Sequence, residues 1–307
     1  MSLIERAAEK LDKNNRSSKA TQIPLQEGNA SSPSSLSSEL LDSASNSESG
    51  QEAETRDTAH AVDTSKRIAK RIEIDLDGLH NKGIVTPNHT KSLVAEQFRL
   101  IKRPLLSNAF NENSGIKHGN LIMVTSSLAG EGKSFCSINL AMSIAMEMDH
   151  RVLLVDADVA RPSIPRTLGF NPEMPGLLDI ILDPQLAVSD VLIKTNVEKL
   201  TLIPAGARHT HATELLASQS MHAILEELAQ RYHDRVVIFD SPPLLLTSEA
   251  RVLATQIGQI VLVVEAERTT QQTVKEALQQ IEACDVINLL YNKARTSNNA
   301  GYYGYYY

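Results

Sequence analysis

The sequence has few of the features that mark secreted or membrane-spanning proteins. Its 307 residues include only two cysteines, Cys136 and Cys284, which is too few for a disulfide framework and typical of a reducing compartment. No apolar run approaches the ~18–20 residues needed to cross a bilayer. The N-terminal stretch mixes acidic with basic residues and lacks the apolar core of a signal peptide. These absences predict a soluble intracellular protein.

Clustered positive charge is also missing. The formal net charge is -7, whereas a surface that binds nucleic acid needs gathered lysine and arginine. The composition therefore excludes nucleic acid as the expected partner. A chain of this length can hold one large domain or two ordinary ones.

Large apolar residues are nearly absent from residues 14–64, which are rich in serine, glutamate, asparagine, threonine and alanine. Such a segment cannot bury enough surface to offset its chain entropy, so we predict that it is disordered. Before it, residues 2–13 have the spacing of a short amphipathic helix, either a docking peptide or a frayed terminus. Residues 1–64 are thus predicted to be a short helix plus a disordered linker, with order from residue 65.

The rest of the chain is organised around a strand, a glycine-rich turn and a helix. Leu121 to Val124 predict a buried strand, Gly130 and Gly132 allow the backbone to bend around phosphate oxygens, and the helix begins after Lys133-Ser134. This is a phosphate-binding loop, although Ser127 replaces its first glycine. An accidental surface turn is the alternative. The expected nucleotide contacts are Ala129, Gly130, Glu131, Gly132, Lys133, Ser134 and Phe135.

Beyond this loop, continuous apolar strands alternate with amphipathic helices, which predicts an α/β fold with a doubly wound parallel sheet. We expect strands at 151–155, 200–204, 236–239, 260–264 and 286–291, and helices at 90–106, 135–148, 218–232 and from 269 onward. Ile72, Ile74 and Leu76 alternate as in a further strand. In such sheets the ligand lies at the carboxyl ends of the strands.

Three aspartates stand at those strand ends. Asp156 and Asp158 follow one predicted strand and Asp240 follows another. Each alone is most often a helix cap or a turn residue. Together with Lys133 and Ser134 they predict a site for a nucleotide triphosphate and Mg²⁺, because the metal offsets the repulsion between carboxylates.

The segments SSLAGEGKS, LLVDADVARP and VVIFDSPP resemble the Walker A, A′ and B motifs of the bacterial tyrosine kinases (BY-kinases), in particular the autokinases encoded with exopolysaccharide and exosortase genes. The resemblance covers about residues 65–307. It implies a P-loop NTPase fold of the MinD/ParA type, with a kinase domain at 65–293, and ATP and Mg²⁺ as cofactors.

The resemblance also implies roles for individual residues. Lys133, Asp156, Asp158 and Asp240 would be catalytic, and Ser134, Asp156 and Asp240 would hold Mg²⁺. Arg161 would contact ATP, with Ala160 at the position where the family has arginine, and Asn292 next to Lys293 would contact the base. Glu96, Arg99 and Lys102 resemble the E-x-x-R-x-x-R motif that builds a ring-shaped homo-oligomer, with Lys102 in place of the last arginine and Arg103 beside it.

Residues 294–307 are predicted to form a flexible tail that carries the phosphoacceptors. Five of the seven tyrosines lie in the last six residues, Tyr302, Tyr303, Tyr305, Tyr306 and Tyr307, separated only by Gly304. A fully extended chain from Ala294 reaches at most about 45 Å, which is enough to enter its own crevice or a neighbour's. An adhesive, self-associating tail is the alternative.

The sequence therefore predicts a tyrosine autokinase. The resemblance implies control of exopolysaccharide synthesis or export, a membrane-embedded chain-length determinant or co-polymerase as activator, and a tyrosine phosphatase as a further partner. It places the protein in the cytoplasm, at the inner membrane through that activator. Two other functions stay open. One is an ATPase switch of the MinD/ParA type, although Leu128 stands where those proteins carry lysine. The other is a nucleotide-gated scaffold.

Overall fold

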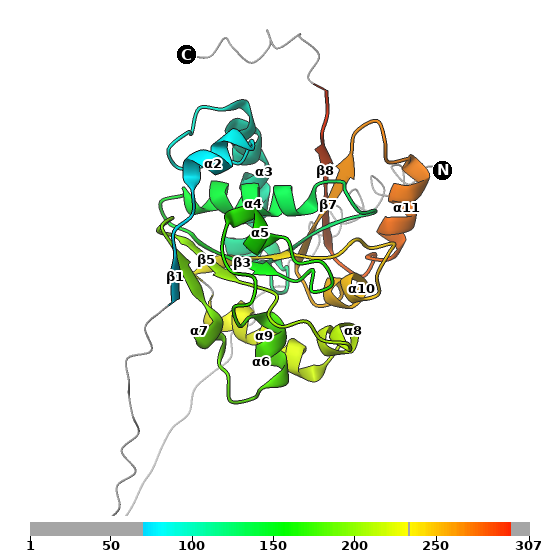
Figure 1. Ribbon diagram of the computed structural model, residues 1–307. Helices are drawn as coiled ribbons and strands as arrows, with labels where there is room; N and C mark the ends of the chain where they lie inside the picture. The colour runs from blue at the N-terminus through cyan, green and yellow to red at the C-terminus, as the bar shows by residue number, and fades with distance from the viewer. Residues whose placement is uncertain (1–69, 233, 296–307) are drawn as a thin grey trace, which may run out of the picture. The chain divides into compact units, whose positions relative to one another are not determined.

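A computed structural model describes residues 70–295 except residue 233 (Figure 1). All of these belong to the second of the two units into which the chain divides, Val62–Tyr307. The predicted helix at 2–13, the linker at 14–64 and the tyrosine cluster lie outside the described residues. Within the described part, no helix combines the length and apolarity needed to cross a membrane.

The strands of the described residues form one eight-stranded sheet in the order β1-β4-β5-β3-β6-β2-β7-β8. All neighbouring pairs are parallel except β4 and β5, which are antiparallel. The doubly wound parallel sheet is thus confirmed, with one antiparallel pair that the sequence does not reveal. The strands are β1 (Lys70–Ile72), β2 (Leu121–Ser126), β3 (Arg151–Asp156), β4 (Ile193–Thr195), β5 (Leu200–Ile203), β6 (Arg235–Asp240), β7 (Gln259–Glu265) and β8 (Val286–Asn292).

Helices cover both faces of this sheet (Figure 1). Neighbouring residues of the central strands point to opposite faces: Ile122 and Val124 join one apolar cluster, and Leu121 and Met123 join the other. The first cluster includes residues of α2 (Leu76–Asn81), α3 (Leu93–Phe110), α4 (Lys133–Ala145) and α5 (Ile164–Leu168). The second includes residues of α6 (Leu177–Leu182), α7 (Val188–Val191), α8 (Ala212–Leu216), α9 (Gln219–Arg231), α10 (Glu249–Ala254) and α11 (Gln271–Gln279). A short 3₁₀ helix, Glu112–Ser114, follows α3.

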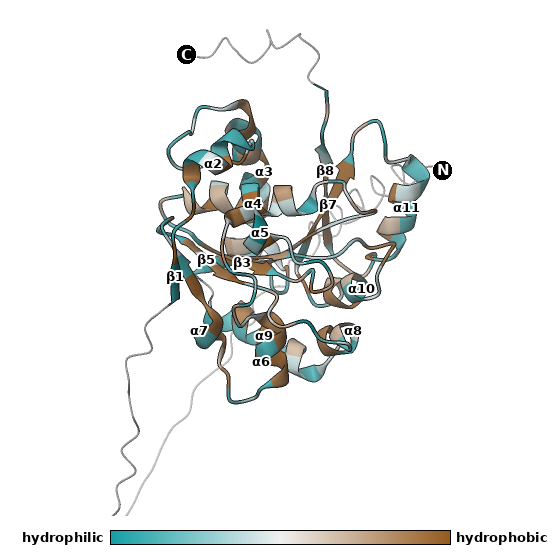
Figure 2. Cartoon of the chain, in the orientation of Figure 1, coloured by the Kyte–Doolittle hydropathy of each residue, from teal (hydrophilic) through white to brown (hydrophobic). Residues whose placement is uncertain are grey.

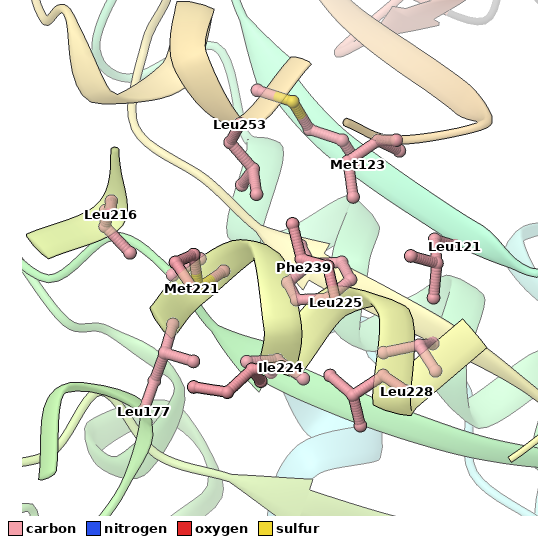
Figure 3. Packing of buried hydrophobic residues seen from close by; sticks show 14 of the residues in the cluster. Leu121, Met123, Leu177, Leu216, Met221, Ile224, Leu225, Leu228, Phe239 and Leu253 are labelled. Atoms are coloured by element: carbon pink, nitrogen blue, oxygen red, sulfur yellow. The ribbon is translucent and has the colours of Figure 1, made fainter. Parts of the chain in front are cut away.

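Helix α9 shows how the second cluster is built. Its apolar residues recur at helical spacing, so Met221, Ile224, Leu225 and Leu228 face the sheet and are buried. Figure 3 shows them against Leu121, Met123 and Phe239 of the strands. The hydropathy colouring agrees, with brown residues on the strands and on the inner faces of the helices (Figure 2).

One predicted strand is wrong in extent. The alternation of Ile72, Ile74 and Leu76 predicts extended chain, but β1 ends at Ile72 and Leu76 begins α2. Asp75 causes the change, because its carboxylate accepts a hydrogen bond from the backbone N–H of Gly78 at 2.9 Å and caps the helix. Ile74 is still buried, in the same cluster as α2.

Candidate active site

The phosphate loop joins β2 to α4. Gly130 and Gly132 have φ of +89° and +99°, in the left-handed region that favours glycine. A Cβ added to Gly132 would lie 2.2 Å from Nδ2 of Asn292, so a side chain there would be strained by the backbone and would also displace that amide. Ser127 is not among the residues with positive φ, which explains why serine fits at the motif's first glycine position.

The loop is held by contacts within the loop itself, with Thr269, and with residues at the end of the edge strand β8. The buried carboxylate of Glu131 accepts hydrogen bonds from the backbone N–H of Leu128, at 2.6 Å, and from the hydroxyl of Thr269. At the end of β8, the Asn292 amide donates to the carbonyl of Glu131 at 2.8 Å. Lys293 Nζ donates to the carbonyl of Gly130 at 2.6 Å. These contacts hold the loop in place before any ligand arrives.

Lys133 lies where the three predicted aspartates meet. Its Nζ is 2.6 Å from Oδ2 of Asp158 and 3.9 Å from Oδ1 of Asp240. Burial lowers the pKa of Lys133, but the charges of Asp240, Asp158 and Asp156 outweigh burial and raise it above the usual value. The ammonium group is therefore charged at neutral pH.

Asp156 and Asp240 stand directly opposite each other on the neighbouring strands β3 and β6. One oxygen of each is held: Asp156 Oδ2 accepts from the backbone N–H groups of Ser163 and Ile164, and Asp240 Oδ1 accepts from the Ser137 hydroxyl. Burial, followed by the nearby charge of Asp240, raises the pKa of Asp156 to about 8. Burial also raises the pKa of Asp240, although Lys133 and the hydroxyls of Ser134 and Ser137 oppose it.

These residues fit a divalent cation. The second oxygens, Asp156 Oδ1 and Asp240 Oδ2, are buried and have no hydrogen-bond partner, and buried carboxylate oxygens are normally satisfied. Mg²⁺ typically uses one or two carboxylates and completes its shell with water and substrate phosphates. Accordingly, no group of three His, Cys, Asp or Glu side chains in residues 70–295 encloses a metal by itself. The Ser134 hydroxyl is 3.3 Å from Lys133 Nζ, within the same cluster.

The other predicted nucleotide contacts lie around the loop. Phe135 is half-buried and lines a groove next to Asn292. Arg161 has an exposed side chain, and its backbone N–H donates to Asp158 Oδ1 at 3.1 Å. The structure thus brings the loop, Lys133 and the aspartates together at the carboxyl ends of the strands, with Asn292 beside the loop.

Sequence reasoning missed three contributors to the site. Ser137 lies one helical turn after Lys133 and positions Asp240. Thr269 anchors Glu131 across 138 residues of sequence. The backbone at the start of α5 holds Asp156. Only the spacing of Ser137 from Lys133 could have indicated such a role, because the other two depend on long-range folding.

On α3, the predicted interface residues differ in exposure. Glu96 is exposed, Arg99 is half-buried, and the two form an ion pair with each other. Lys102, in contrast, is buried, with Nζ 2.7 Å from the carbonyl of Ser143 and 2.6 Å from Glu147 Oε1. The hydrogen bond from Lys102 holds the pKa of Glu147 below its usual value. The ammonium of Lys102 is therefore used inside the subunit, at the end of α4, and Arg103 is the exposed cation next to it.

The fold and this site define a class of protein: a P-loop nucleotide-binding domain with acidic residues at the ends of the next two strands of the sheet, β6 and β3. A family model for the AAA domain matches residues 119–292. CapB of Staphylococcus aureus is 30% identical over 219 residues, covering 70% of this chain and 91% of CapB. The tyrosine-protein kinase YwqD of Bacillus subtilis is 27% identical and covers 73% of this chain and 92% of YwqD. The BceF tyrosine kinase domain superposes with a TM-score of 0.58 at 28% identity, covering 73% of this chain and 91% of that domain.

The chain belongs to the family of bacterial protein-tyrosine kinases. The resemblance to the bacterial tyrosine kinases found in the sequence is thereby confirmed.

Proposed function

We propose that this protein transfers the γ-phosphoryl group of ATP to tyrosine hydroxyls, including those of its own C-terminal tail. The observation that carries the proposal is the convergence of the phosphate loop, Lys133 and three buried carboxylates at one edge of the sheet, in a chain of a tyrosine-kinase family.

In this proposal the site residues have separate tasks. The backbone of residues 129–135 surrounds the phosphates, Lys133 neutralises charge on the β- and γ-phosphates, and Mg²⁺ is held by Ser134, Asp156 and Asp240. Bound Mg²⁺ supplies further charge neutralisation. Arg161 contacts phosphate and Asn292 contacts the base. Asp158 exchanges its ion pair with Lys133 for a place beside the incoming tyrosine.

The reaction needs one proton acceptor. As the tyrosine Oη–phosphorus bond forms and the bond to the β-phosphate oxygen breaks, the phenolic proton passes to a carboxylate, and ADP leaves. A free phenol has a pKa near ~10, so it reaches the site protonated at neutral pH. Asp158 is the acceptor in this proposal, because it follows β3, lies 2.6 Å from Lys133 Nζ and is not among the residues that hold Mg²⁺.

The acceptors we propose are Tyr302, Tyr303, Tyr305, Tyr306 and Tyr307. They begin seven residues after Arg295, the last described residue, so the tail can reach its own site or that of a neighbour. We further propose a homo-oligomer in which α3 forms the contact. Exposed Glu96 and half-buried Arg99 remain available for this contact, with exposed Arg103 as the third charged residue in place of the buried Lys102.

The biological role we infer is control of exopolysaccharide synthesis or export, with a membrane-embedded co-polymerase as activator and a tyrosine phosphatase that reverses the modification. The activator would bring the protein to the inner membrane. The similarity to bacterial tyrosine kinases supports this role.

Phosphosite mapping tests the proposal. The purified full chain is incubated with ATP and Mg²⁺, with and without an activator fragment, and its peptides are analysed by mass spectrometry. We expect phosphotyrosine mainly in the last six residues, and none in Lys133→Met or Asp156→Ala proteins. Lys275→Met is the matched control, because Lys275 is an exposed residue of α11. Hydrolysis of ATP without any phosphotyrosine would instead identify a nucleotide-driven switch.

A further inference from the structure

An apolar groove of about 620 Å³ runs between α3 and β8. We call it the α3–β8 groove. From α3 it is lined by Leu93, Leu100 and Pro104 among others, and from β8 by Leu289 and Tyr291. One end reaches Lys293 and Ala294, where the chain leaves the sheet. No task of the proposed kinase reaction uses its leucine-rich part.

The exposed apolar side chains of the described residues gather at this groove. Leu93, Leu100, Leu289 and Tyr291 are 56%, 57%, 58% and 64% exposed, which makes them four of the eight large hydrophobic side chains that stay exposed. A contiguous exposed apolar patch of this kind marks an interaction surface. Asn288 also lines the groove, and its Nδ2 is buried without a hydrogen-bond partner.

Strand β8 adds a second reason to expect an extended peptide here. It is the last strand of the sheet and pairs only with β7 among the described strands, so its outer backbone groups face away from any neighbour in the sheet. Such an edge is a template for another strand. Peptides that bind in this way gain main-chain hydrogen bonds along the edge and place alternate side chains in adjoining pockets.

The length of chain that follows β8 points to the occupant. The backbone at Lys293, directly after β8, has a φ of +58°, in the left-handed region. Twelve residues, 296–307, follow the last described residue. Fully extended they span about 40 Å, whereas the seven residues of β8 span about 23 Å. The tail is therefore long enough to turn back and lie along the whole strand.

The composition of the tail fits the groove. Its tyrosines each carry a large apolar ring with one polar end, and such rings pack well against leucine and against other aromatic rings. We propose that residues 296–307 dock in cis along the α3–β8 groove, with tyrosine rings against Leu100, Leu289 and Tyr291, and that this is the resting position of the unmodified tail.

If the tail docks in this way, its phosphorylation should release it from the groove. Each phosphate adds about 1.5–2 negative charges, and burying that charge against leucine is strongly unfavourable. A phosphorylated tail would leave the groove and expose it. Only this release step depends on the proposed kinase function; docking itself does not.

The protein has no tryptophan, so a single one placed in the tail reports its surroundings. In the full chain with Tyr305→Trp, we expect emission at shorter wavelength than that of a free tail peptide, and weaker quenching by acrylamide. The shift should disappear in Leu289→Glu and, independently, in Leu100→Glu, and persist in Leu182→Glu, a matched exposed leucine on α6. Two groove variants on different elements, each checked for an unchanged melting curve, guard against local unfolding.

Three outcomes decide the proposal. Emission equal to that of the free peptide overturns docking. A shift that grows with protein concentration overturns the cis arrangement and indicates a neighbouring copy. After incubation with ATP and Mg²⁺, the shift should be lost in step with phosphorylation; its persistence on a phosphorylated tail overturns release. If no phosphate is incorporated, the proposed function fails, and the docking result without ATP still stands.

Discussion

At the scale of single residues, the unusual feature is the pair of facing carboxylates, Asp156 and Asp240. Neither is neutralised fully by the protein: Lys133 is 2.6 Å from Asp158 but 3.9 Å from Asp240. Ionising these carboxylates without a metal is therefore costly in the folded state. A cation and a triphosphate would relieve this cost, which couples ligand binding to stability.

The pH dependence of stability should reveal this cost. Without metal, the pKa of Asp156 is about 8 in the folded chain, against 3.8 for an ordinary aspartate. Between these values the folded state holds a proton that the unfolded state has lost, so the free energy of unfolding should fall as pH rises through this range. Asp156→Asn should remove this slope and make the variant more stable than the wild type at pH 8.

Urea unfolding in EDTA at several pH values measures the effect as a difference between the two proteins, so that other titrating groups cancel. Mg²⁺ with ATP should restore the wild type at high pH, since the cation displaces the proton, and should leave the variant unchanged. A difference that does not vary between pH 5 and 8 would contradict the prediction.

At the scale of elements, the end of α4 is tied to α3 by one buried cation. Lys102 donates to the carbonyl of Ser143 and to Glu147, where a positive charge also suits the negative end of the helix. Glu147 is partly exposed, so most of the stabilisation comes from the buried carbonyl contact.

Substitution of this cation should weaken folding and leave assembly unchanged. Lys102→Met should lower the free energy of unfolding by about 1–3 kcal/mol, because it removes a charged donor from a buried acceptor. The neighbouring Arg103→Met is the matched control, with little expected loss, since Arg103 is exposed. Chemical denaturation measures stability and light scattering measures mass. If the Lys102 variant keeps its stability but forms smaller oligomers, Lys102 takes part in the contact between subunits and the prediction is wrong.

Elements with strong local signals were predictable. The apolar runs at β2, β3, β6, β7 and β8 are continuous, and their positions agree with the structure within one or two residues. Elements that depend on tertiary pairing could not be predicted. Strand β4 has three residues and forms because it pairs with β1 and β5. Helices α5 to α7 have four to six residues each, which is too short for a clear helical pattern in the sequence. The same limit applies to the site, where strand-end aspartates are visible in the sequence but the contact between Glu131 and Thr269 is not.

At the scale of the whole molecule, strand order explains why the site assembles. β6 lies between β3 and β2 in the sheet. The phosphate loop after β2 and the aspartates at the ends of β3 and β6 therefore lie side by side at the carboxyl ends of these strands. Ligands of doubly wound sheets bind at the carboxyl ends of the strands. The chain separates these segments widely, and only the sheet brings them together.

The same sheet connects the site to the exit of the tail. β8 pairs with β7, β7 with β2, and the side chains of Asn292 and Lys293 at the end of β8 bind carbonyls of the phosphate loop. Asn292 is thus 161 residues from its acceptor in sequence and in direct contact in space. It has two candidate roles, contact with the base and support of the loop, and they predict different results.

Asn292→Ala separates the two roles. If the amide supports the loop, the variant should bind ATP about 5–10-fold more weakly, the worth of one hydrogen bond, and it should lose the same factor for inorganic tripolyphosphate, which has no base. If the amide contacts adenine, tripolyphosphate affinity should stay unchanged while ATP affinity falls. Calorimetric titration of both ligands measures this. Asn288→Ala on the same strand is the control, because Nδ2 of Asn288 has no hydrogen-bond partner, whereas Nδ2 of Asn292 donates to the phosphate loop. The Asn292 amide donates to the Glu131 carbonyl at 2.8 Å, so we expect ATP and tripolyphosphate to lose affinity by the same factor. Strand β8, which the tail follows, would then also support the phosphate loop.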